Sequence, residues 1–257
     1  MKTVTLARTL WRMSFAAGPQ REEARYKLAA AIANRISPGA VLTEALKSWP
    51  DDERFWRWYR RAEPQGLRSA DRKFLLRELL QLVDGYPGDT AECGVYQGTS
   101  SWLICDHFRG SGKTHFGFDS FAGLSQPGAS DGQYWEGGNL SVGEEHARQV
   151  LAGMPAVLYR GWIPERFREV EERRFCFVHL DVDLYQPTLD SLQFFYPRTV
   201  PGGLIVCDDY GFKSCPGARR AFDGFMADKP ERVVHVPTGQ GFVVRRSAPA
   251  ASGGMGD

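Results

Sequence analysis

The sequence lacks the features that define disulfide-rich, zinc-binding and membrane-spanning proteins. Its five cysteines show no C-x-x-C spacing and lie mostly within apolar runs, so we interpret them as buried hydrophobic residues in a reducing compartment. No apolar stretch approaches the roughly 20 residues that cross a membrane. The N-terminal residues contain no continuous apolar core of a signal peptide. We therefore expect a cytoplasmic protein with no membrane partner.

An excess of charge of either sign is also lacking. The 257 residues include 32 basic and 31 acidic side chains, and no basic stripe stands out. A nucleic-acid-binding protein needs such a stripe, so we expect no nucleic-acid partner. The hydrophobic fraction of 42% is that of an ordinary globular protein. The length suits one α/β domain with an appended segment.

Two apolar runs of strand length end in carboxylates. The first, Phe175–Tyr185, begins with residues that are apolar on both faces, as in a strand buried inside a parallel sheet. At its end Asp181 and Asp183 are two positions apart, which predicts that their side chains leave the same face of the strand.

The second run, Gly203–Gly211, delivers Asp208 and Asp209 at the end of its own strand. Ligands of open α/β sheets lie outside the carboxyl ends of the strands. Four carboxylates that converge there repel one another unless a cation or a proton intervenes, and Mg²⁺ is the simplest solution. The alternative is that one or two of these aspartates only cap the following helices.

A glycine turn follows the first predicted strand, Thr90–Val95. The turn Gly94–Gly98 leads into a helix that Thr99–Ser101 are expected to cap. This arrangement brings bare backbone to a nucleotide-like ligand in α/β folds. The spacing is not G-x-G-x-x-G, and Glu92 precedes Gly94, which favours a cofactor with an amino-acid moiety and no phosphate. A plain glycine turn is the alternative.

Two further strand ends carry candidate cofactor ligands. Asp119 follows the predicted strand His115–Phe118, at the position where Rossmann-like proteins hold ribose hydroxyls. Its alternative role is an exposed helix cap. Trp162 follows the predicted strand Val157–Arg160 and is placed either against a flat ring such as adenine or in the core.

Two segments carry aromatic residues whose role the sequence leaves open. Residues 122–142 are rich in Gly, Ser and Pro, and Tyr134 and Trp135 in their middle favour a lid over a linker. In the first 68 residues, one predicted helix aligns Phe55, Trp58 and Tyr59 on one face. That stripe either packs on the main domain or a second subunit, or covers a substrate.

The remaining pattern alternates strands and helices and ends in a β-hairpin. Further helices are predicted over Arg21–Asn34, Val41–Lys47, residues 50–62, Arg72–Asp84, Gly143–Ala152, the segment from Tyr185 to Phe195, and Ser214–Ala227. The hairpin is predicted from Val233–Pro237 and Phe242–Arg246, and residues 247–257 are expected to be a disordered tail.

Five motifs of the sequence resemble those of a known protein family. AECGVYQGTSS, FGFDSFAGL, RGWIPE, HLDVDLYQPTLDSL and PGGLIVCDDYG are similar, in order and spacing, to the macrocin O-methyltransferase family over residues 69–245. That family methylates sugar hydroxyls of macrolides and related antibiotics with Mg²⁺. The resemblance implies a class I methyltransferase, Rossmann-like α/β fold over residues 69–246: a mostly parallel seven-stranded sheet with a C-terminal antiparallel hairpin. Residues 1–68 match the family only loosely, and their own pattern predicts an N-terminal helical segment that serves as a lid, as an oligomer contact or as both.

The resemblance also implies roles for individual residues. Asp181, Asp208 and Asp209 would hold Mg²⁺, and Asp183 would be the general base. The S-adenosylmethionine site would be lined by Glu92, Gly94, Tyr96, Ser100, Asp119, Ser120, Trp162 and Asp181, with Asp119 on the ribose. Tyr96-Gln97 departs from the family, which often has a basic or bulky residue there.

The chemistry of methyl transfer agrees with these roles. A sugar hydroxyl is protonated at neutral pH, so it needs a cation to orient it and a carboxylate to take its proton. His179 is an alternative base that is expected to lie deeper in the strand. The leading hypothesis is therefore a Mg²⁺-dependent O-methyltransferase that acts on a deoxysugar of a glycosylated small molecule. The alternatives are methylation of a catechol-type phenol, a D-x-D glycosyltransferase and a non-enzymatic scaffold. Self-association through the N-terminal helices is also expected.

Overall fold

The structure is a computed structural model that describes residues 3–38, 42, 44–62 and 69–247. The chain forms two compact units, Met1–Trp58 and Tyr59–Asp257. The domain boundary predicted between residues 68 and 69 lies at the edge of residues 63–68, which are outside the described residues. The tail predicted as disordered also falls outside them, except for Ser247.

The first unit is helical, as predicted. It contains α1 (Thr3–Phe15), α2 (Pro19–Ile36), the short 3-10 helix η1 (Trp49–Asp51) and the start of α3 (Glu53–Ala62). Pro19 suits the first turn of α2 because its missing N–H would have no partner there. Within α3, the rings of Phe55 and Trp58 lie 5.7 Å apart, so these two predicted stripe residues are neighbours.

The helix predicted over Val41–Lys47 is wrong. The described residues of this range, Leu42 and residues 44–47, form no helix. Leu46 has a positive φ of 61°, which is costly for a side chain with a Cβ and incompatible with a continuing right-handed helix.

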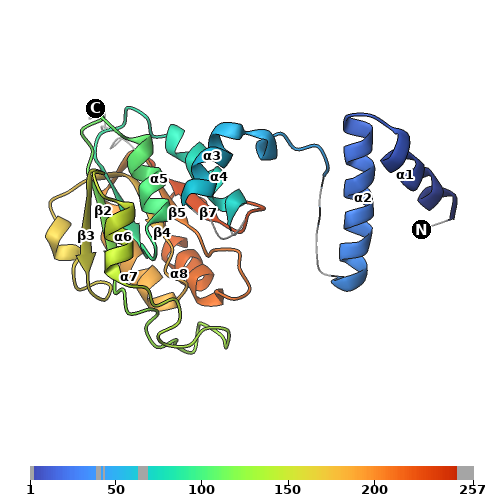
Figure 1. Ribbon diagram of the computed structural model, residues 1–257. Helices are drawn as coiled ribbons and strands as arrows, with labels where there is room; N and C mark the ends of the chain where they lie inside the picture. Colours follow the sequence, from blue (N-terminus) through green and yellow to red (C-terminus); the bar gives the residue numbers. More distant parts are fainter. Residues whose placement is uncertain (1–2, 39–41, 43, 63–68, 248–257) are drawn as a thin grey trace, which may run out of the picture. The chain divides into compact units, whose positions relative to one another are not determined.

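The second unit is built on a seven-stranded sheet, which confirms the predicted fold class (Figure 1). Its strands are β1 (Asp89–Cys93), β2 (His115–Asp119), β3 (Ala156–Arg160), β4 (Phe175–Leu180), β5 (Thr199–Cys207), β6 (Val234–His235) and β7 (Gly241–Val244). Their order is β3-β2-β1-β4-β5-β7-β6. The first five pair in parallel, while β7 runs antiparallel to both β5 and β6. The predicted hairpin is therefore present, with shorter strands than expected.

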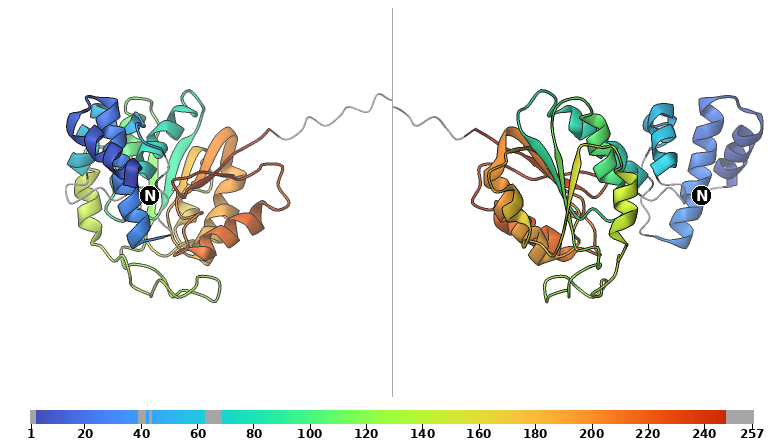
Figure 2. Two further views of the ribbon diagram at one scale, coloured as in Figure 1. Left: turned by 90° about the vertical axis from the view of Figure 1, so that its right-hand side faces the viewer. Right: turned by 60° about the vertical axis from the view of Figure 1, so that its left-hand side comes forward.

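Helices cover both faces of the sheet (Figure 2). They are α4 (Ala70–Gln81), α5 (Thr99–His107) and α6 (Glu144–Val150) on one face, and α7 (Tyr185–Phe195) and α8 (Pro216–Met226) on the other. The 3-10 helices η2 (Phe167–Val170) and η3 (Tyr196–Arg198) complete the unit. No helix in the described part of the chain is long and apolar enough to cross a membrane. The two helical layers explain why the central strands are apolar on both faces.

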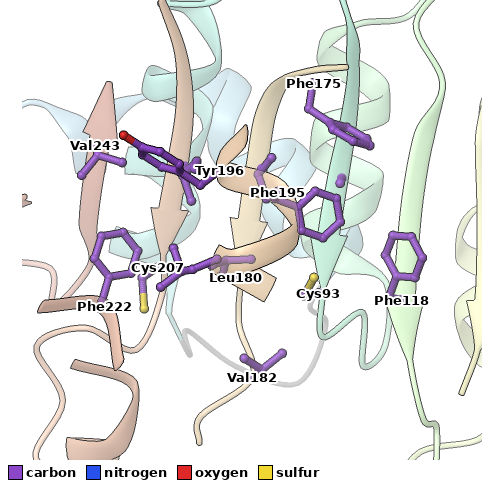
Figure 3. Close-up of a cluster of buried hydrophobic side chains, with 14 of the residues drawn as sticks. Cys93, Phe118, Phe175, Leu180, Val182, Phe195, Tyr196, Cys207, Phe222 and Val243 are labelled. Atoms are coloured by element: carbon purple, nitrogen blue, oxygen red, sulfur yellow. The ribbon is translucent and has the colours of Figure 1, made fainter. Parts of the chain in front are cut away.

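The main core cluster lies between the sheet and the helices α7 and α8. Every residue of β4 is buried. Figure 3 shows Phe195 of α7 beside Phe118 of β2 and Phe175 of β4, and its ring centroid lies 5.9 and 5.1 Å from theirs in edge-to-face arrangements. All five cysteines are buried and unpaired, as predicted. This packing fixes the strands, so the residues that follow their carboxyl ends have defined positions.

Candidate active site

A cavity of about 740 Å³ lies at the carboxyl ends of the parallel strands. Its volume is typical of a small-molecule site. Nine of the eleven predicted site residues line it: Gly94, Tyr96, Ser100, Asp119, Ser120, Trp162, Asp181, Asp183 and Asp209. Glu92 and Asp208 are not among the lining residues and lie beneath the cavity wall. Residues at or just after the ends of β1, β2, β3, β4 and β5, far apart in sequence, therefore meet at one place.

The glycine turn after β1 shapes one end of the cavity. Gly94 has a φ of 87°, and a Cβ on it would lie 1.8 Å from the carbonyl oxygen of Asp181. Only glycine allows this approach between the ends of β1 and β4. The backbone N–H groups of Val95 and Tyr96 donate to Asp119 Oδ2 at 2.8 and 2.7 Å. Asp119 thus holds the turn in place from the cavity edge, and its predicted contact with a ribose stays a prediction.

Glu92 lies behind this turn and does not reach the cavity. Its side chain is fully buried, accepts a hydrogen bond from the Ser101 hydroxyl and faces His179 Nδ1 at 2.7 Å. Burial would raise the pKa of Glu92, but the interactions with His115 and His179 outweigh it and lower the pKa to about 2. We therefore correct its predicted direct contact with a cofactor to a supporting role beneath the turn.

The predicted cap of α5 is wrong. The residue before the helix is Gly98, which has a left-handed backbone and provides no side-chain cap. Ser101 instead bonds to Glu92, and Ser100 accepts a hydrogen bond from Lys73 Nζ. These hydroxyls connect α5 to the charged groups under the cavity.

Trp162 stands at the cavity edge after β3 and is 41% exposed. The alternative that it is a core tryptophan is therefore wrong, and a flat ligand ring can lie against it.

Asp181 and Asp183 reach the cavity by a different route from the predicted one. β4 ends at Leu180, and Asp183 has a positive φ of 59°, so the two side chains do not leave one face of an extended strand. That part of the prediction is wrong because the chain turns immediately after the strand. The Asp183 N–H donates to Asp209 Oδ2 at 2.8 Å, which places both carboxyl groups at the same end of the cavity.

The acidic residues have shifted pKa values because they are close together and withdrawn from water. Burial, followed by the charge of Asp181, raises the pKa of Asp183. Burial and the charges of Asp183 and Asp181 raise the pKa of Asp209 well above its usual value, and burial with the charge of Asp208 raises that of Asp181. Each shift has burial as its main cause and the negative charge of a neighbouring carboxylate as its second.

Asp208 behaves in the opposite way. Burial would raise its pKa, but the hydrogen bond from His179 and the charge of Arg72 outweigh burial and lower it. His179 is fully buried with both ring nitrogens facing carboxylates, Nδ1 toward Glu92 and Nε2 toward Asp208 at 3.3 Å. Burial would lower the pKa of His179, but these two partners raise it to about 9. Because His179 does not line the cavity, it is not placed to act as the base.

The donor set is suited to a hard divalent cation. Ligand atoms of His179, Asp181 and Asp208 lie within 4.8 Å of one another, and those of Asp183, Asp209 and Cys215 form a neighbouring group. Carboxylate oxygens are the ligands that Mg²⁺ prefers. The three predicted ligands thus fall in two adjacent groups, with Asp181 and Asp208 in one and Asp209 in the other.

Several polar residues at this site were not predicted. Arg72 Nη1 contacts Asp208 Oδ2, and Gln240 Nε2 donates to Asp208 Oδ1 at 2.7 Å. Lys73 had a recognisable signal, because it shares the buried face of α4 with Leu76 and Leu80 at helical spacing. A lysine on an apolar helix face indicates a buried polar partner. The contacts of Arg72 and Gln240 depend on tertiary structure and have no such signal.

Residues 122–142 form one wall of the cavity. They contain no helix or strand, and Leu124, Ser125, Trp135 and Leu140 line the cavity. Asp131 anchors the segment, because its buried carboxylate accepts a hydrogen bond from the Tyr185 N–H at 2.6 Å. The predicted cover over the site is therefore present as a wall, whereas its movement stays a prediction.

The fold and the cavity together define a class of protein. A mostly parallel seven-stranded sheet ending in an antiparallel strand, with a glycine turn after β1 and an acidic residue after β2 at one cavity, is the class I methyltransferase arrangement. A solved structure of the O-methyltransferase NovP matches 69% of this chain and 81% of its own, with a TM-score of 0.59 and 24% sequence identity. This likeness shows the fold.

The family follows from the sequence. The model of the macrocin O-methyltransferase (TylF) family matches residues 72–235, more than half of the chain, and the chain therefore belongs to that family. One relative, from Streptomyces olivaceus, is 8-demethyl-8-(2,3-dimethoxy-alpha-L-rhamnosyl)-tetracenomycin-C 4'-O-methyltransferase, 31% identical over 56% of this chain and 60% of the relative. Another, from Streptomyces niveus, is demethyldecarbamoylnovobiocin O-methyltransferase, 28% identical over 59% of this chain and 64% of the relative. The chain spans about three fifths of the length of these curated relatives.

Proposed function

We propose that this protein is an S-adenosylmethionine-dependent O-methyltransferase that methylates a sugar hydroxyl of a glycosylated natural product. One observation carries the proposal. A single cavity is lined both by the glycine turn with Asp119, which we assign as the cofactor end, and by Asp181, Asp183 and Asp209, which we assign as the acceptor end. A methyl donor and an acceptor hydroxyl bound in one cavity satisfy the need of methyl transfer for an in-line approach.

The first end of the cavity suits the cofactor. Gly94 brings bare backbone to the cavity, and Asp119 stands at the edge with a carboxylate fixed by two N–H groups. Trp162 offers a flat face to an adenine ring. S-adenosylmethionine supplies the methyl group, and the role of these residues is to hold its nucleoside and amino-acid parts.

The second end suits the acceptor and its proton. Asp183 is proposed as the general base, because its raised pKa is closer to neutral pH than that of an ordinary aspartate, and a base is most effective there. Cys215 Sγ donates to Asp183 Oδ1 at 3.4 Å and holds the carboxylate in place.

We further propose that Asp181, Asp208 and Asp209 hold Mg²⁺, which when bound would orient an acceptor hydroxyl and make it more acidic. Two features support this. The donors are carboxylates, and burial together with the charge of neighbouring carboxylates raises the pKa values of Asp181 and Asp209, which a bound cation would offset. The curated relative named for a rhamnosyl 4'-O-methyltransferase favours a deoxysugar as the acceptor class. Family membership argues against the glycosyltransferase alternative.

Calorimetry and a transfer assay test the proposal. We expect S-adenosylmethionine to bind in buffer with Mg²⁺ and in buffer with EDTA, because the cofactor end of the cavity does not use the metal. Methyl transfer from labelled cofactor to a panel of rhamnosylated acceptors should occur only with Mg²⁺. Absence of cofactor binding in both buffers contradicts the enzyme assignment, and transfer only to catechols contradicts the sugar.

Replacing Asp183 with Asn tests the base. We expect turnover to fall by about 10²- to 10⁴-fold, because the amide cannot accept the proton, while cofactor affinity stays the same. Asp106→Asn, at an exposed carboxylate of α5, is the matched control and should leave turnover unchanged. Normal turnover of the Asp183 variant would remove the base assignment.

A further inference from the structure

Arg72 places a permanent positive charge on one of the proposed metal ligands. Its Nη1 contacts Asp208 Oδ2, and its guanidinium carbon lies 4.9 Å from the centroid of the Phe212 ring. The Asp208 side chain is 1% exposed, whereas that of Arg72 is 25% exposed and lines the cavity. The buried carboxylate is therefore reached from the cavity side by a side chain that is itself in contact with solvent.

Both oxygens of Asp208 already have donors. Oδ1 accepts a hydrogen bond from Gln240 Nε2 at 2.7 Å and faces His179 Nε2 at 3.3 Å, while Oδ2 is taken by Arg72. Gln240 and His179 are fully buried and fixed by packing. A cation that binds Asp208 from the cavity must therefore approach Oδ2, where it meets the guanidinium and is repelled by it.

We propose that Arg72 is an internal cation that competes with Mg²⁺ for Asp208, so that metal binding requires the guanidinium to leave this carboxylate. The inference rests on the metal site of the proposed function. It makes Arg72 a positioning residue that neutralises Asp208 before the metal arrives. Arg72 lies in the first turn of α4 and lines the cavity, and the proposal requires its side chain to turn toward that space.

Lys73, the residue after Arg72, also carries a positive charge but makes a different contact. Lys73 Nζ donates to Ser100 Oγ, and its side chain is buried. It contributes positive charge near Asp181 and Asp208 without occupying a carboxylate oxygen. Lys73 is therefore expected to stay in place when the metal binds, and only Arg72 has to move.

Titration of the whole chain with MgCl₂ alone tests the competition, with heat as the readout. We expect Arg72→Gln to bind Mg²⁺ at least about fivefold more tightly than the unmodified chain, because the variant lacks a positive charge in direct contact with a proposed metal ligand. In an Asp208→Asn background the same change should give no gain, because its effect passes through Asp208. Arg109→Gln, which removes an arginine paired with Asp106 at 3.0 Å on the exposed side of α5, is the matched control and should leave the affinity unchanged.

The outcomes separate this inference from the proposed function. If the unmodified chain binds Mg²⁺ and Arg72→Gln binds it equally or more weakly, the competition is wrong while the metal site stands. An equal gain in the Asp208→Asn background also overturns the competition, because it shows a general effect of charge. If neither protein binds Mg²⁺, the metal site itself is wrong, and the competition falls with it.

A measurement on the unmodified chain keeps the inference testable if the variant does not fold. Phenylglyoxal modifies exposed guanidinium groups, and peptide mass spectrometry reports the rate at each arginine. Saturating Mg²⁺ should raise the labelling rate of Arg72 several-fold, because the guanidinium leaves Asp208, and should leave that of Arg109 unchanged. An unchanged or lower rate at Arg72 means that the salt bridge persists beside the metal and overturns the proposal.

Discussion

Gly94 sets how closely the ends of β1 and β4 approach, and it is therefore the most restrictive position of the cofactor end. Replacing it with Ala places a methyl group 1.8 Å from the Asp181 carbonyl oxygen at a φ of 87°. The left-handed backbone alone costs about 1–3 kcal/mol in a residue with a side chain. We expect a larger loss in the free energy of unfolding, measured in urea, and loss of cofactor binding in calorimetry.

Gly110 provides the matched control. It has a similar φ of 79°, but a Cβ there meets nothing within 4 Å. In Gly110→Ala the free energy of unfolding should fall only by the cost of the left-handed backbone, about 1 kcal/mol, and the cofactor affinity should not change. Equal destabilisation of the two variants would show that the contact with Asp181 does not constrain the turn.

At the scale of single residues, the sequence identified chemistry better than geometry. The acids after β4 and β5 were predicted because each follows a strand-length apolar run, and nine predicted residues do line one cavity. The positive φ of Asp183 was not predictable, since no local pattern marks it. The pairing of Arg72 with Asp208 joins residues 136 positions apart and depends entirely on how α4 packs.

At the scale of elements, buried strands were the most predictable features. β4 is apolar on both faces because helices cover both faces of the sheet, so its run could be recognised directly. Helix ends were less predictable. The serines after Gly98 suit a capping role chemically, but their hydroxyls bond to Lys73 and Glu92, which come from other elements. Contacts with residues of other elements thus took the place of the helix cap that the local sequence favours.

The wall segment 122–142 has a buried anchor in Asp131, and this makes the position of the segment testable. Asp131 accepts hydrogen bonds from the Tyr185 N–H at 2.6 Å and the Gly128 N–H at 2.7 Å. Asp131→Ala removes both bonds and leaves the half-buried Tyr185 N–H group without this partner, which costs about 1–3 kcal/mol locally. We expect limited proteolysis to cut within 122–142 about tenfold faster, since each 1.4 kcal/mol is a factor of ten in the open population.

The control for this segment is an aspartate outside it. Asp190 accepts a hydrogen bond from Gln186 on the exposed side of α7, and Asp190→Ala should leave the cleavage rate of 122–142 unchanged. If Asp131→Ala resists protease as well as the unmodified chain, the wall is held by its apolar contacts and Asp131 is not its anchor.

At the scale of the whole molecule, the acidic end of the cavity should couple metal binding to stability. The folded chain brings together carboxylates whose pKa values are raised by burial and mutual repulsion, and the unfolded chain separates them. A cation that binds only the folded state stabilises it by about 2.7 kcal/mol at 100 times its Kd. We expect Mg²⁺ to raise Tm by roughly 5 °C or more over EDTA in calorimetric scans.

Two variants test whether the Mg²⁺-dependent change in Tm comes from these carboxylates. Asp209→Asn removes a proposed ligand and should abolish most of the Mg²⁺-dependent change in Tm. Asp106→Asn lies on exposed α5 and should keep the change. The same Tm in Mg²⁺ and EDTA for the unmodified chain contradicts a metal site at these carboxylates.

The aromatic residues of the N-terminal helices are the basis for the predicted self-association, and two of them are exposed on α1. On α1, Trp11 is 60% exposed and Phe15 is 73% exposed, with ring centroids 6.0 Å apart on one side of the helix. Contiguous exposed apolar side chains of this kind mark interaction surfaces.

We expect the chain to sediment as an oligomer. The double variant Trp11→Ser with Phe15→Ser should shift it toward monomer. Its cofactor affinity should not change, because the cavity residues belong to the second unit. Leu82→Ser, at a 59% exposed leucine of the second unit, should leave association unchanged. A chain that sediments as a monomer at all concentrations contradicts this prediction and leaves the catalytic proposal intact.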